Sequence, residues 1–378
     1  MFNKAHNFNI EQINIEVSGH LEGALRDLHR KVAGSALLNS NERPGTARCH
    51  PRTHVAVQQD IFRFVNRDHD IPDRWPKQIL WLIGPAGSGK TAIMNTIAEE
   101  LKSQGNLAAA FFFSSSSGIP GRAITNRFVS TLAYQLIQHK GLPGVKKRIL
   151  FSIAKNPAIL EMTLKEQMEV LILQPLRKCH RVPRDALSKQ MILVDGLDEC
   201  GRPSSESYGS GGADREAILG ILLGALKVPA FPFRLVIASR PDPVIQYTLT
   251  VPPELSSVEI LLDHKYNPDA DIRLFLVSRF EQIRQKYPHL PSSWPGEAII
   301  EILVRNASQQ MIYAATIIHF VVSPSNHPRA QLDIILNRRH VANPPNPNPF
   351  GPFGCTILKN SQFLSRPNPC HQVAQGLP

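Results

Sequence analysis

The segment Gly84–Thr91 matches the pattern G-x-x-x-x-G-K-[ST] at every required position. Glycines in such a loop allow left-handed backbone angles, so successive N–H groups can turn toward one anion. The Lys90 ammonium can then reach the β- and γ-phosphates of a nucleotide, and the Thr91 hydroxyl can ligate Mg²⁺. The candidate phosphate-binding residues are Gly84, Pro85, Ala86, Gly87, Ser88, Gly89, Lys90 and Thr91.

The residues around this loop have the order that phosphate binding requires. The apolar run 79–83 predicts a buried parallel strand, and apolar residues recur at helical spacing after the loop, at Ile93, Ile97 and Leu101. The alternative is a glycine turn that binds no ligand. The order strand, loop, helix makes phosphate binding the favoured interpretation.

Strands and helices alternate over most of the chain. Further apolar runs predict strands at 107–113, 191–194, 234–239 and 258–262. Helical periodicity appears at 54–66, 127–139, 160–176 and 214–227. This alternation predicts an α/β fold, with a parallel five-stranded sheet flanked by helices. A small all-α domain is expected to follow, with helices at 271–286, 297–304, 311–322 and 329–336.

Four regions are expected along the 378 residues. Residues 1–47 are polar and weakly patterned, and are interpreted as a linker or the remnant of an effector. Residues 48–262 form the α/β core and residues 263–340 the helical domain. The tail 341–378 holds eight prolines and is expected to be disordered. Within the core, the Ser/Gly-rich stretch 204–212 is expected to be a surface loop.

The net charge of +11 is concentrated between Lys140 and Lys189, which hold eleven Lys and Arg against four Asp and Glu. A nucleic-acid groove usually interleaves aromatic residues for stacking, and only Phe151 is available here. A solvated helical surface is therefore favoured over a nucleic-acid patch. The five cysteines are scattered, which argues against a disulfide framework or a zinc site. Without a signal core or a spanning apolar run, a cytoplasmic protein with no membrane partner is expected.

A phosphate loop needs an acidic partner for its metal, and Asp195 is the best candidate. It ends a buried strand, which places its carboxylate at the carboxyl edge of the sheet, where ligands bind in open α/β sheets. Asp195 would hold Mg²⁺ through water, together with Thr91. Asp198 and Glu199 could orient or deprotonate an attacking water. The alternative for this acidic cluster is a solvated loop or a helix N-cap.

Arg240 directly follows the apolar strand 234–239, so it should project over the same edge of the sheet. A guanidinium there could sense the γ-phosphate or stabilise charge in the transition state. A surface arginine at a strand terminus is the alternative. The pair Cys49–His50 has no companion at metal-ligand spacing and is interpreted as structural.

Together these residues resemble a NACHT-type NTPase of the STAND class, in particular the fungal NLR-like proteins with a nephrocystin-type P-loop module. The resemblance covers roughly residues 48 to 338 and is specific in combination. The matching segments are Cys49–Thr53, Trp81–Thr91, Ala110–Ser114, Thr131–Leu136, Val194–Cys200, Ile237–Pro241 and Met311–Thr316.

The resemblance implies a nucleotide-driven signalling switch with slow ATP hydrolysis, often used in self/non-self recognition. ADP would hold a closed monomer, and exchange for ATP with Mg²⁺ would permit oligomerisation with itself or with other NLR-like proteins. Lys90 and Thr91 would be the Walker A residues, Asp195 the Walker B aspartate and Arg240 the sensor. Asp198 and Glu199 match the extended acidic motif of the family.

Family members usually continue into a winged-helix module and repeats, where this chain has its proline-rich tail, so a truncated gene product is expected. One alternative function is an interaction scaffold with no working nucleotide site. Another is a nucleic-acid-associated ATPase, motivated by the basic segment. A GTPase is disfavoured because the chain has no Asn-Lys-x-Asp motif for reading guanine.

Overall fold

The computed structural model describes residues 19–41, 47–66, 77–114, 125–142, 144–179, 189–201, 210–250, 257–323 and 327–340. The predicted disordered tail lies outside the described residues, as does most of the predicted loop 204–212. The chain divides into two compact units, residues 1–267 and 268–378.

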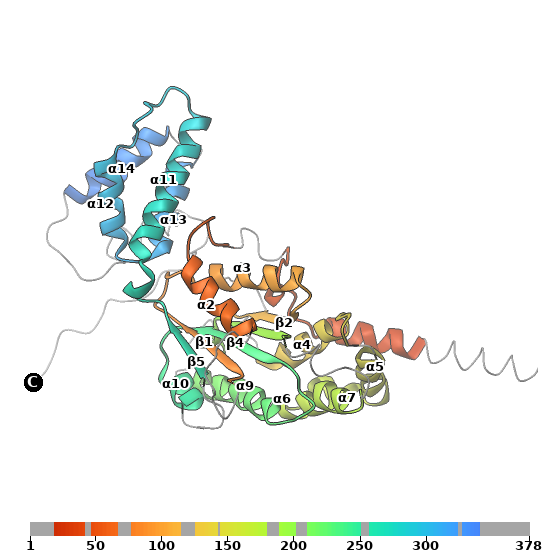
Figure 1. The fold of residues 1–378 in the computed structure, drawn as a ribbon. Helices are drawn as coiled ribbons and strands as arrows, with labels where there is room; N and C mark the ends of the chain where they lie inside the picture. Colours follow the sequence, from red (N-terminus) through yellow and green to blue (C-terminus); the bar gives the residue numbers. More distant parts are fainter. Residues whose placement is uncertain are drawn as a thin grey trace, which may run out of the picture. The chain divides into compact units, whose positions relative to one another are not determined.

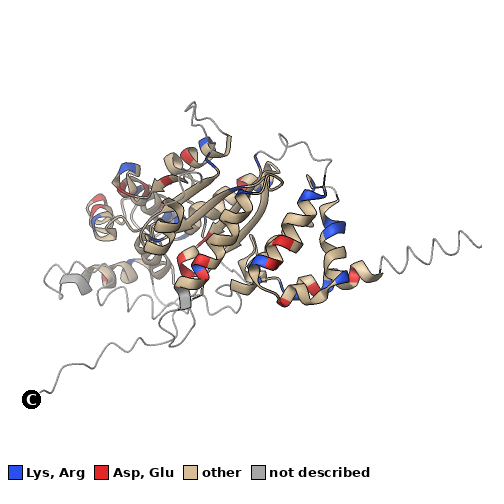
Figure 2. Ribbon diagram, turned by 90° about the horizontal axis from the view of Figure 1, so that it is seen from below, with Lys and Arg blue, Asp and Glu red and all other residues tan. Residues whose placement is uncertain are grey.

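The first unit is built on a five-stranded sheet with the order β2-β3-β4-β1-β5, in which every pairing is parallel. This confirms the predicted α/β class and its parallel five-stranded sheet. The strands are β1 (Ile79–Ile83), β2 (Leu107–Phe112), β3 (Met191–Asp195), β4 (Arg234–Ser239) and β5 (Ser257–Leu261). The first four are buried almost throughout, which explains why their sequences read as continuous apolar runs. Charged residues lie mainly on the helices (Figure 2).

Two layers of helices cover the sheet (Figure 1). One face packs against α2 (Val55–Asn66) and α3 (Lys90–Ser103), with alternate strand residues such as Leu80 and Leu82 in that cluster. The intervening residues, such as Trp81, face a larger cluster. That cluster is covered by α4 (Phe128–Leu136), α5 (Val145–Lys155), α6 (Leu164–Gln167), η4 (Met168–Leu173), α7 (Gln174–Arg177), α9 (Ser210–Leu226) and α10 (Pro243–Thr250).

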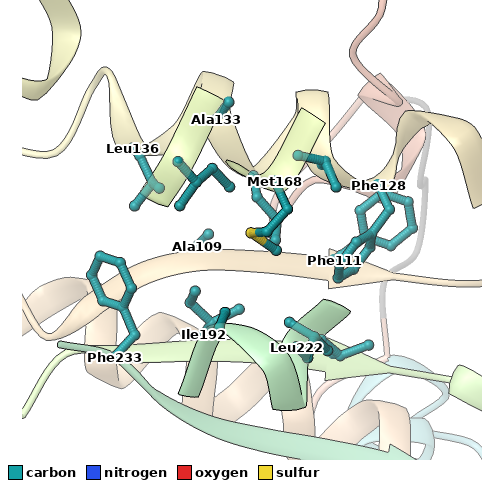
Figure 3. Packing of buried hydrophobic residues seen from close by; sticks show 14 of the residues in the cluster. Ala109, Phe111, Phe128, Ala133, Leu136, Met168, Ile192, Leu222 and Phe233 are labelled. Carbon is teal, nitrogen blue, oxygen red and sulfur yellow. The ribbon is translucent and has the colours of Figure 1, made fainter. Parts of the chain in front are cut away.

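Part of the larger cluster appears in Figure 3, where Phe111 of β2 lies against Phe128 of α4. Their ring centroids are 5.1 Å apart. Aromatic pairs at this separation contribute about 1 kcal/mol beyond the apolar area that they bury. The cluster thus fixes α4 across the edge strand β2.

The N-terminal segment belongs to the same core. Residues 19–30 form a helix, followed by the short turn η1 (Gly34–Ala36). Ala24, Leu28, Ala33 and Ala36 are buried in the larger cluster. The Ala33 N–H donates to Thr131 Oγ1 at 2.9 Å, and Ser130 Oγ donates to the Lys31 carbonyl at 2.8 Å. Residues 19–36 are therefore an integral part of the first unit, which the polar character of residues 1–47 does not reveal.

The side chain of Gln135 on α4 takes the place of a neighbouring strand at the outer edge of β2. Its Nε2 donates to the Ala110 carbonyl at 2.9 Å, and its Oε1 accepts from the Ala110 N–H at 2.9 Å. Unpaired backbone groups of an edge strand invite pairing with another chain. One amide therefore satisfies both groups where β2 has no further strand beside it.

Replacing Gln135 with alanine is expected to lower the free energy of unfolding by about 2 kcal/mol, because the donor and acceptor of buried Ala110 lose their partner. Chemical denaturation would measure the loss. Gln138→Ala is the matched control, since Gln138 is exposed and bonds only locally to Tyr134. Equal stability of the two variants would show that Gln135 does not protect the edge.

All regular secondary structure in the described residues of the second unit is helical. Its helices are α11 (Pro268–Lys286), α12 (Glu297–Ala307), α13 (Met311–Val321) and α14 (Pro328–His340). Their apolar faces meet in one cluster that includes Leu276, Leu303 and Ile317. The helical periodicity after residue 263 correctly predicts these four elements. Among the described residues of both units, every helix is too short or too polar to cross a membrane.

Candidate functional site

The loop from Gly84 to Gly89 joins β1 to α3, in the strand–loop–helix order that the sequence predicts. Gly87 and Gly89 have φ values of 79° and 98°, in the left-handed region that favours glycine. At Gly84, a Cβ atom would lie 2.7 Å from Ser88 Oγ. The left-handed path of the backbone thus favours glycine at 87 and 89, and at Gly84 an added Cβ would also lie 3.0 Å from Leu262 Cβ. Ser88 Oγ also donates to the Pro85 carbonyl at 2.9 Å, which closes the turn.

Lys90 opens α3, and its ammonium folds back over the loop. Nζ donates to the carbonyls of Gly84 and Pro85, at 2.7 and 2.8 Å. Burial lowers the pKa of Lys90 from its ordinary value, while the negative charges of Asp198 and Asp195 act to raise it. Arg240 and Glu199 contribute smaller effects of opposite sign on the same pKa. The Lys90 ammonium therefore lies in the electrostatic field of the four other charged residues that the sequence predicts for this site.

The strand register explains why these residues meet. Ile83 at the end of β1 is paired with Ser239 of β4, and Asp195 at the end of β3 is paired with Ala238. Three neighbouring parallel strands therefore end at one edge, and the residues that follow them project over it. Asp195 itself is only 2% exposed.

A short turn places the remaining two carboxylates. Gly196 adopts φ 69°, ψ 34°, and the 3₁₀ turn η5 (Leu197–Glu199) follows it. Within η5, Asp198 is buried, and Glu199 is partly exposed. Left-handed geometry at Gly196 turns the chain away from β3, so both carboxylates face the end of β4.

Arg240 is held by both of these carboxylates. Its Nε lies 3.3 Å from Asp198 Oδ2, its backbone N–H donates to Asp198 Oδ1 at 3.0 Å, and a terminal nitrogen lies 3.4 Å from Glu199 Oε1. The Asp198 side chain is 5% exposed, whereas that of Arg240 is 41% exposed. The guanidinium thus joins a buried carboxylate to the solvent side of the site.

Arg215 of α9 contacts both the turn η5 and the segment that follows Arg240. It donates to the Asp198 carbonyl at 3.2 Å, and its Nε lies 3.5 Å from Asp242 Oδ2. Asp242 in turn caps α10 by accepting from the Val244 and Ile245 N–H groups. The sequence gives no signal for this connection, because Arg215 lies in a helix far along the chain from either partner.

Thr91 is exposed in the first turn of α3, and its carbonyl accepts from Asn95 Nδ2 at 2.8 Å. Pro85 is exposed and Ala86 and Gly87 are partly exposed, so the outer side of the loop faces solvent. The first turn of α3 contains no acidic residue. The positive end of the helix dipole is therefore open toward the loop.

His54 supports the loop from the other side, which the sequence does not predict. Its backbone has φ 56°, its side chain is buried, and Nε2 lies 3.3 Å from the Ser88 carbonyl. A Cβ atom added to Gly89 would lie 3.0 Å from the same nitrogen. The preceding segment is tied to α3, since the Cys49 N–H donates to Thr96 Oγ1 at 3.0 Å. His54 thus positions the loop, while Cys49 and His50 have structural contacts.

Cysteine chemistry near the site is disfavoured. Cys200 follows η5 directly, but burial raises the pKa of its thiol to about 11. A thiol with so high a pKa is a poor nucleophile at neutral pH. The described residues also contain no group of three or more His, Cys, Asp and Glu side chains suited to hold a metal by themselves.

A family model described as nephrocystin 3, N-terminal, matches residues 67–240. The match contains every candidate site residue, from Gly84 to Arg240. Over these residues, which are less than half of the chain, the protein is similar to the nephrocystin 3 N-terminal family. A comparison with curated proteins finds no match.

Similar solved structures include a chain from the structure of the E. coli MS115-1 HORMA:CdnC:Trip13 complex. The two chains are 15% identical and superpose with a TM-score of 0.34. The alignment covers 77% of this chain and 87% of that chain.

Proposed function

We propose that this protein is a NACHT-type P-loop NTPase, a signalling switch that binds ATP and ADP with Mg²⁺. The observation that carries the proposal is the convergence of Lys90, Asp195, Asp198, Glu199 and Arg240. The charges of the other four residues act on the Lys90 ammonium, and that ammonium lies over a glycine loop at the start of a helix. The match to the nephrocystin-like family over residues 67–240 supports it.

Phosphate binding would use the loop and α3 together. The N–H groups of a glycine loop and the positive end of a helix form an anion site. Lys90 would exchange its two carbonyl partners for phosphate oxygens, so that the ammonium donates to anionic acceptors in place of neutral ones. The chemistry of the loop thus favours a polyphosphate ligand, and the choice of ATP follows from the family resemblance.

The oxygen donors at the site fit Mg²⁺. Thr91 offers a hydroxyl and Asp195 a carboxylate, and Mg²⁺ prefers hard oxygen ligands while keeping several waters. Bound Mg²⁺ would neutralise charge on the phosphates. The two side chains come from the helix α3 and from the end of the strand β3, so they would approach a nucleotide from two different elements.

Arg240 would distinguish ATP from ADP. A third phosphate offers the guanidinium an anionic partner that competes with Asp198 and Glu199, and ADP lacks it. Release of the two carboxylates would also leave them able to orient an attacking water, which suits slow hydrolysis. The ion pairs of Arg240 thereby become the part of the site that changes between the two nucleotides, and oligomerisation would follow this change.

Titration of Mg·ATP and Mg·ADP into the full chain by isothermal calorimetry tests the proposed function. Saturable binding of both nucleotides is expected. A folded chain that binds neither would instead support an interaction scaffold without a working nucleotide site.

Replacing Arg240 with alanine is expected to reduce the ratio of ATP to ADP affinity roughly tenfold or more, because one charged hydrogen-bond partner of the third phosphate is lost. The affinity for ADP should change little. Arg240→Lys is the matched variant, since it keeps the charge but not the forked geometry of the guanidinium. Its ratio of ATP to ADP affinity should lie between those of the wild type and Arg240→Ala. If both nucleotides lose affinity equally in calorimetry, Arg240 does not read the third phosphate.

A further inference from the structure

Helix α5 carries an unbalanced positive charge. Residues 140–160 contain five Lys and Arg and no Asp or Glu. The apolar face of α5 is buried in the larger cluster through Val145, Ile149 and Ile153. The basic side chains of the helix are left on its outer face, where all of them are exposed: Lys146, Lys147, Arg148 and Lys155.

These four cations have no ion-pair partner within the part of the chain that the structure describes. Basic residues near them behave differently, since Lys31 pairs with Glu161 and Arg177 pairs with Glu169. Acidic side chains are therefore present on this side of the unit but do not neutralise α5. The outer face of the helix is available to an anionic partner.

Phe151 lies in the middle of this basic face and is 61% exposed. It follows Lys147 by four residues and precedes Lys155 by four, so the three side chains form one stripe along the helix. At 1.5 Å per residue, Lys147 and Lys155 are about 12 Å apart along the axis, with the aromatic ring between them. Arg148 lies three residues before Phe151 and borders the same stripe. Composition alone favours a solvated surface, because Phe151 is the only aromatic residue between Lys140 and Lys189. Its exposure between cations that lack ion-pair partners in the described structure changes this balance, because a ring flanked by cations is the arrangement that stacking on a single strand uses.

We propose that the outer face of α5 binds single-stranded nucleic acid. Lys147, Arg148 and Lys155 would contact successive phosphates, and Phe151 would stack against a base between them. The alternation of cation, ring and cation along the stripe matches the alternation of phosphate and base along a single strand. Sequence preference is expected to be weak, because every base presents a face for stacking.

An anionic membrane fits this face less well. Membrane-surface helices lay a broad apolar face into the bilayer, and the apolar face of α5 is already buried in the protein. Phe151 alone offers little apolar area for insertion, whereas one ring is enough to stack one base. The proposal is independent of the nucleotide site, which uses none of these residues.

Fluorescence anisotropy with the full chain and a fluorescein-labelled single-stranded DNA of mixed sequence tests the proposal. Binding is expected at 50 mM salt. With three phosphate contacts, the affinity should fall about 20-fold between 50 and 200 mM salt as counterions are released. Failure to bind at 50 mM salt would overturn the proposal.

Matched variants separate this face from general electrostatic attraction. Phe151→Ala is expected to weaken binding roughly tenfold through lost stacking. Tyr247→Ala, which removes another exposed aromatic ring on α10, should have no effect. Lys147→Glu should likewise weaken binding far more than Lys102→Glu, which reverses an exposed charge on α3. Equal losses within either pair would overturn the assignment to α5.

Two further measurements distinguish the other partners. Vesicles containing phosphatidylserine should compete poorly with the labelled DNA, and strong competition that Phe151→Ala abolishes would transfer the site to a membrane surface. Saturating Mg·ATP should not displace the labelled DNA from the wild type. Displacement would mean that the DNA occupies the loop at Lys90 and not α5.

Discussion

The Lys90→Ala variant is expected to bind Mg·ATP and Mg·ADP about a hundredfold more weakly than the wild type. The ammonium is the only group on the loop that carries a full positive charge, and it already bonds two oxygens of that loop. A hydrogen bond to a charged group contributes roughly 1.5–3 kcal/mol, so losing its phosphate contacts accounts for a change of this size. Calorimetric titration of both nucleotides would measure it.

Lys102→Ala is the matched control, because Lys102 lies in the same helix but is exposed at its other end. It should bind both nucleotides like the wild type. Circular dichroism of both variants should match that of the wild type, which separates lost binding from lost folding. Wild-type affinity in a folded Lys90→Ala protein would contradict the assignment of the loop to phosphate binding.

The lowered pKa of Lys90 gives this site two pH dependences of opposite sign. Nucleotide affinity should be lost as pH rises through the lowered folded-state pKa, because the ammonium becomes neutral. Between that pKa and the ordinary value of 10.5, the unfolded chain binds more protons than the folded one. The stability of the ligand-free protein therefore gains a contribution as pH rises through this window.

The sheet could be predicted because its chemistry is local in the sequence. Strands buried on both faces must be apolar at every position, which leaves short continuous runs bounded by polar residues. The observed bounds of β4 coincide with the predicted run 234–239, and β3 extends the run 191–194 by one residue. The site residues follow from the same logic, since Asp195 ends β3, Arg240 directly follows β4, and the other site residues lie in the segments that continue from β1 and β3.

Helical regions show where the sequence signal fails. The helix predicted over 160–176 is observed from Leu164 to Arg177 as α6, η4 and α7 in direct succession, but its predicted start is wrong. The turn η3 (Pro157–Glu161) ends before it, and Thr163 caps the helix by accepting from the Glu166 N–H. A continuous apolar period hides such a cap. Likewise, α9 begins at Ser210, inside the predicted loop 204–212, so Gly211 and Gly212 are helical despite their low propensity.

The contacts within the site were beyond prediction for a different reason. The sequence places Asp198, Glu199 and Arg240 at one edge, but their ion pairs depend on the turn η5 and on side-chain conformation. The support from His54 depends on a residue with a left-handed backbone that lies outside any regular element. Both are properties of tertiary packing, which single-sequence patterns do not encode.

Gly196→Ala is expected to destabilise the protein by about 3 kcal/mol, the largest effect on stability among the variants proposed. Its φ of 69° lies in the left-handed region, where a side chain costs about 1–2 kcal/mol. An added Cβ would also lie 2.9 Å from the Phe113 carbonyl oxygen. That oxygen cannot yield easily, because the Phe113 N–H donates to the Asp195 carbonyl at 2.9 Å and continues the ladder between β2 and β3.

Gly105→Ala is the matched control for this prediction. Gly105 has φ 72°, close to that of Gly196, but nothing lies within 4 Å of its added Cβ. The free energy of unfolding of Gly105→Ala, measured by chemical denaturation, should fall by only about 1–2 kcal/mol, which is the cost of a side chain in a left-handed backbone. Equal losses would show that Phe113 yields without cost. The difference between the two variants therefore measures how firmly the end of β2 fixes the turn that carries Asp198 and Glu199. A rigid turn is needed if the ion pairs of Arg240 with these carboxylates are to change between ATP and ADP.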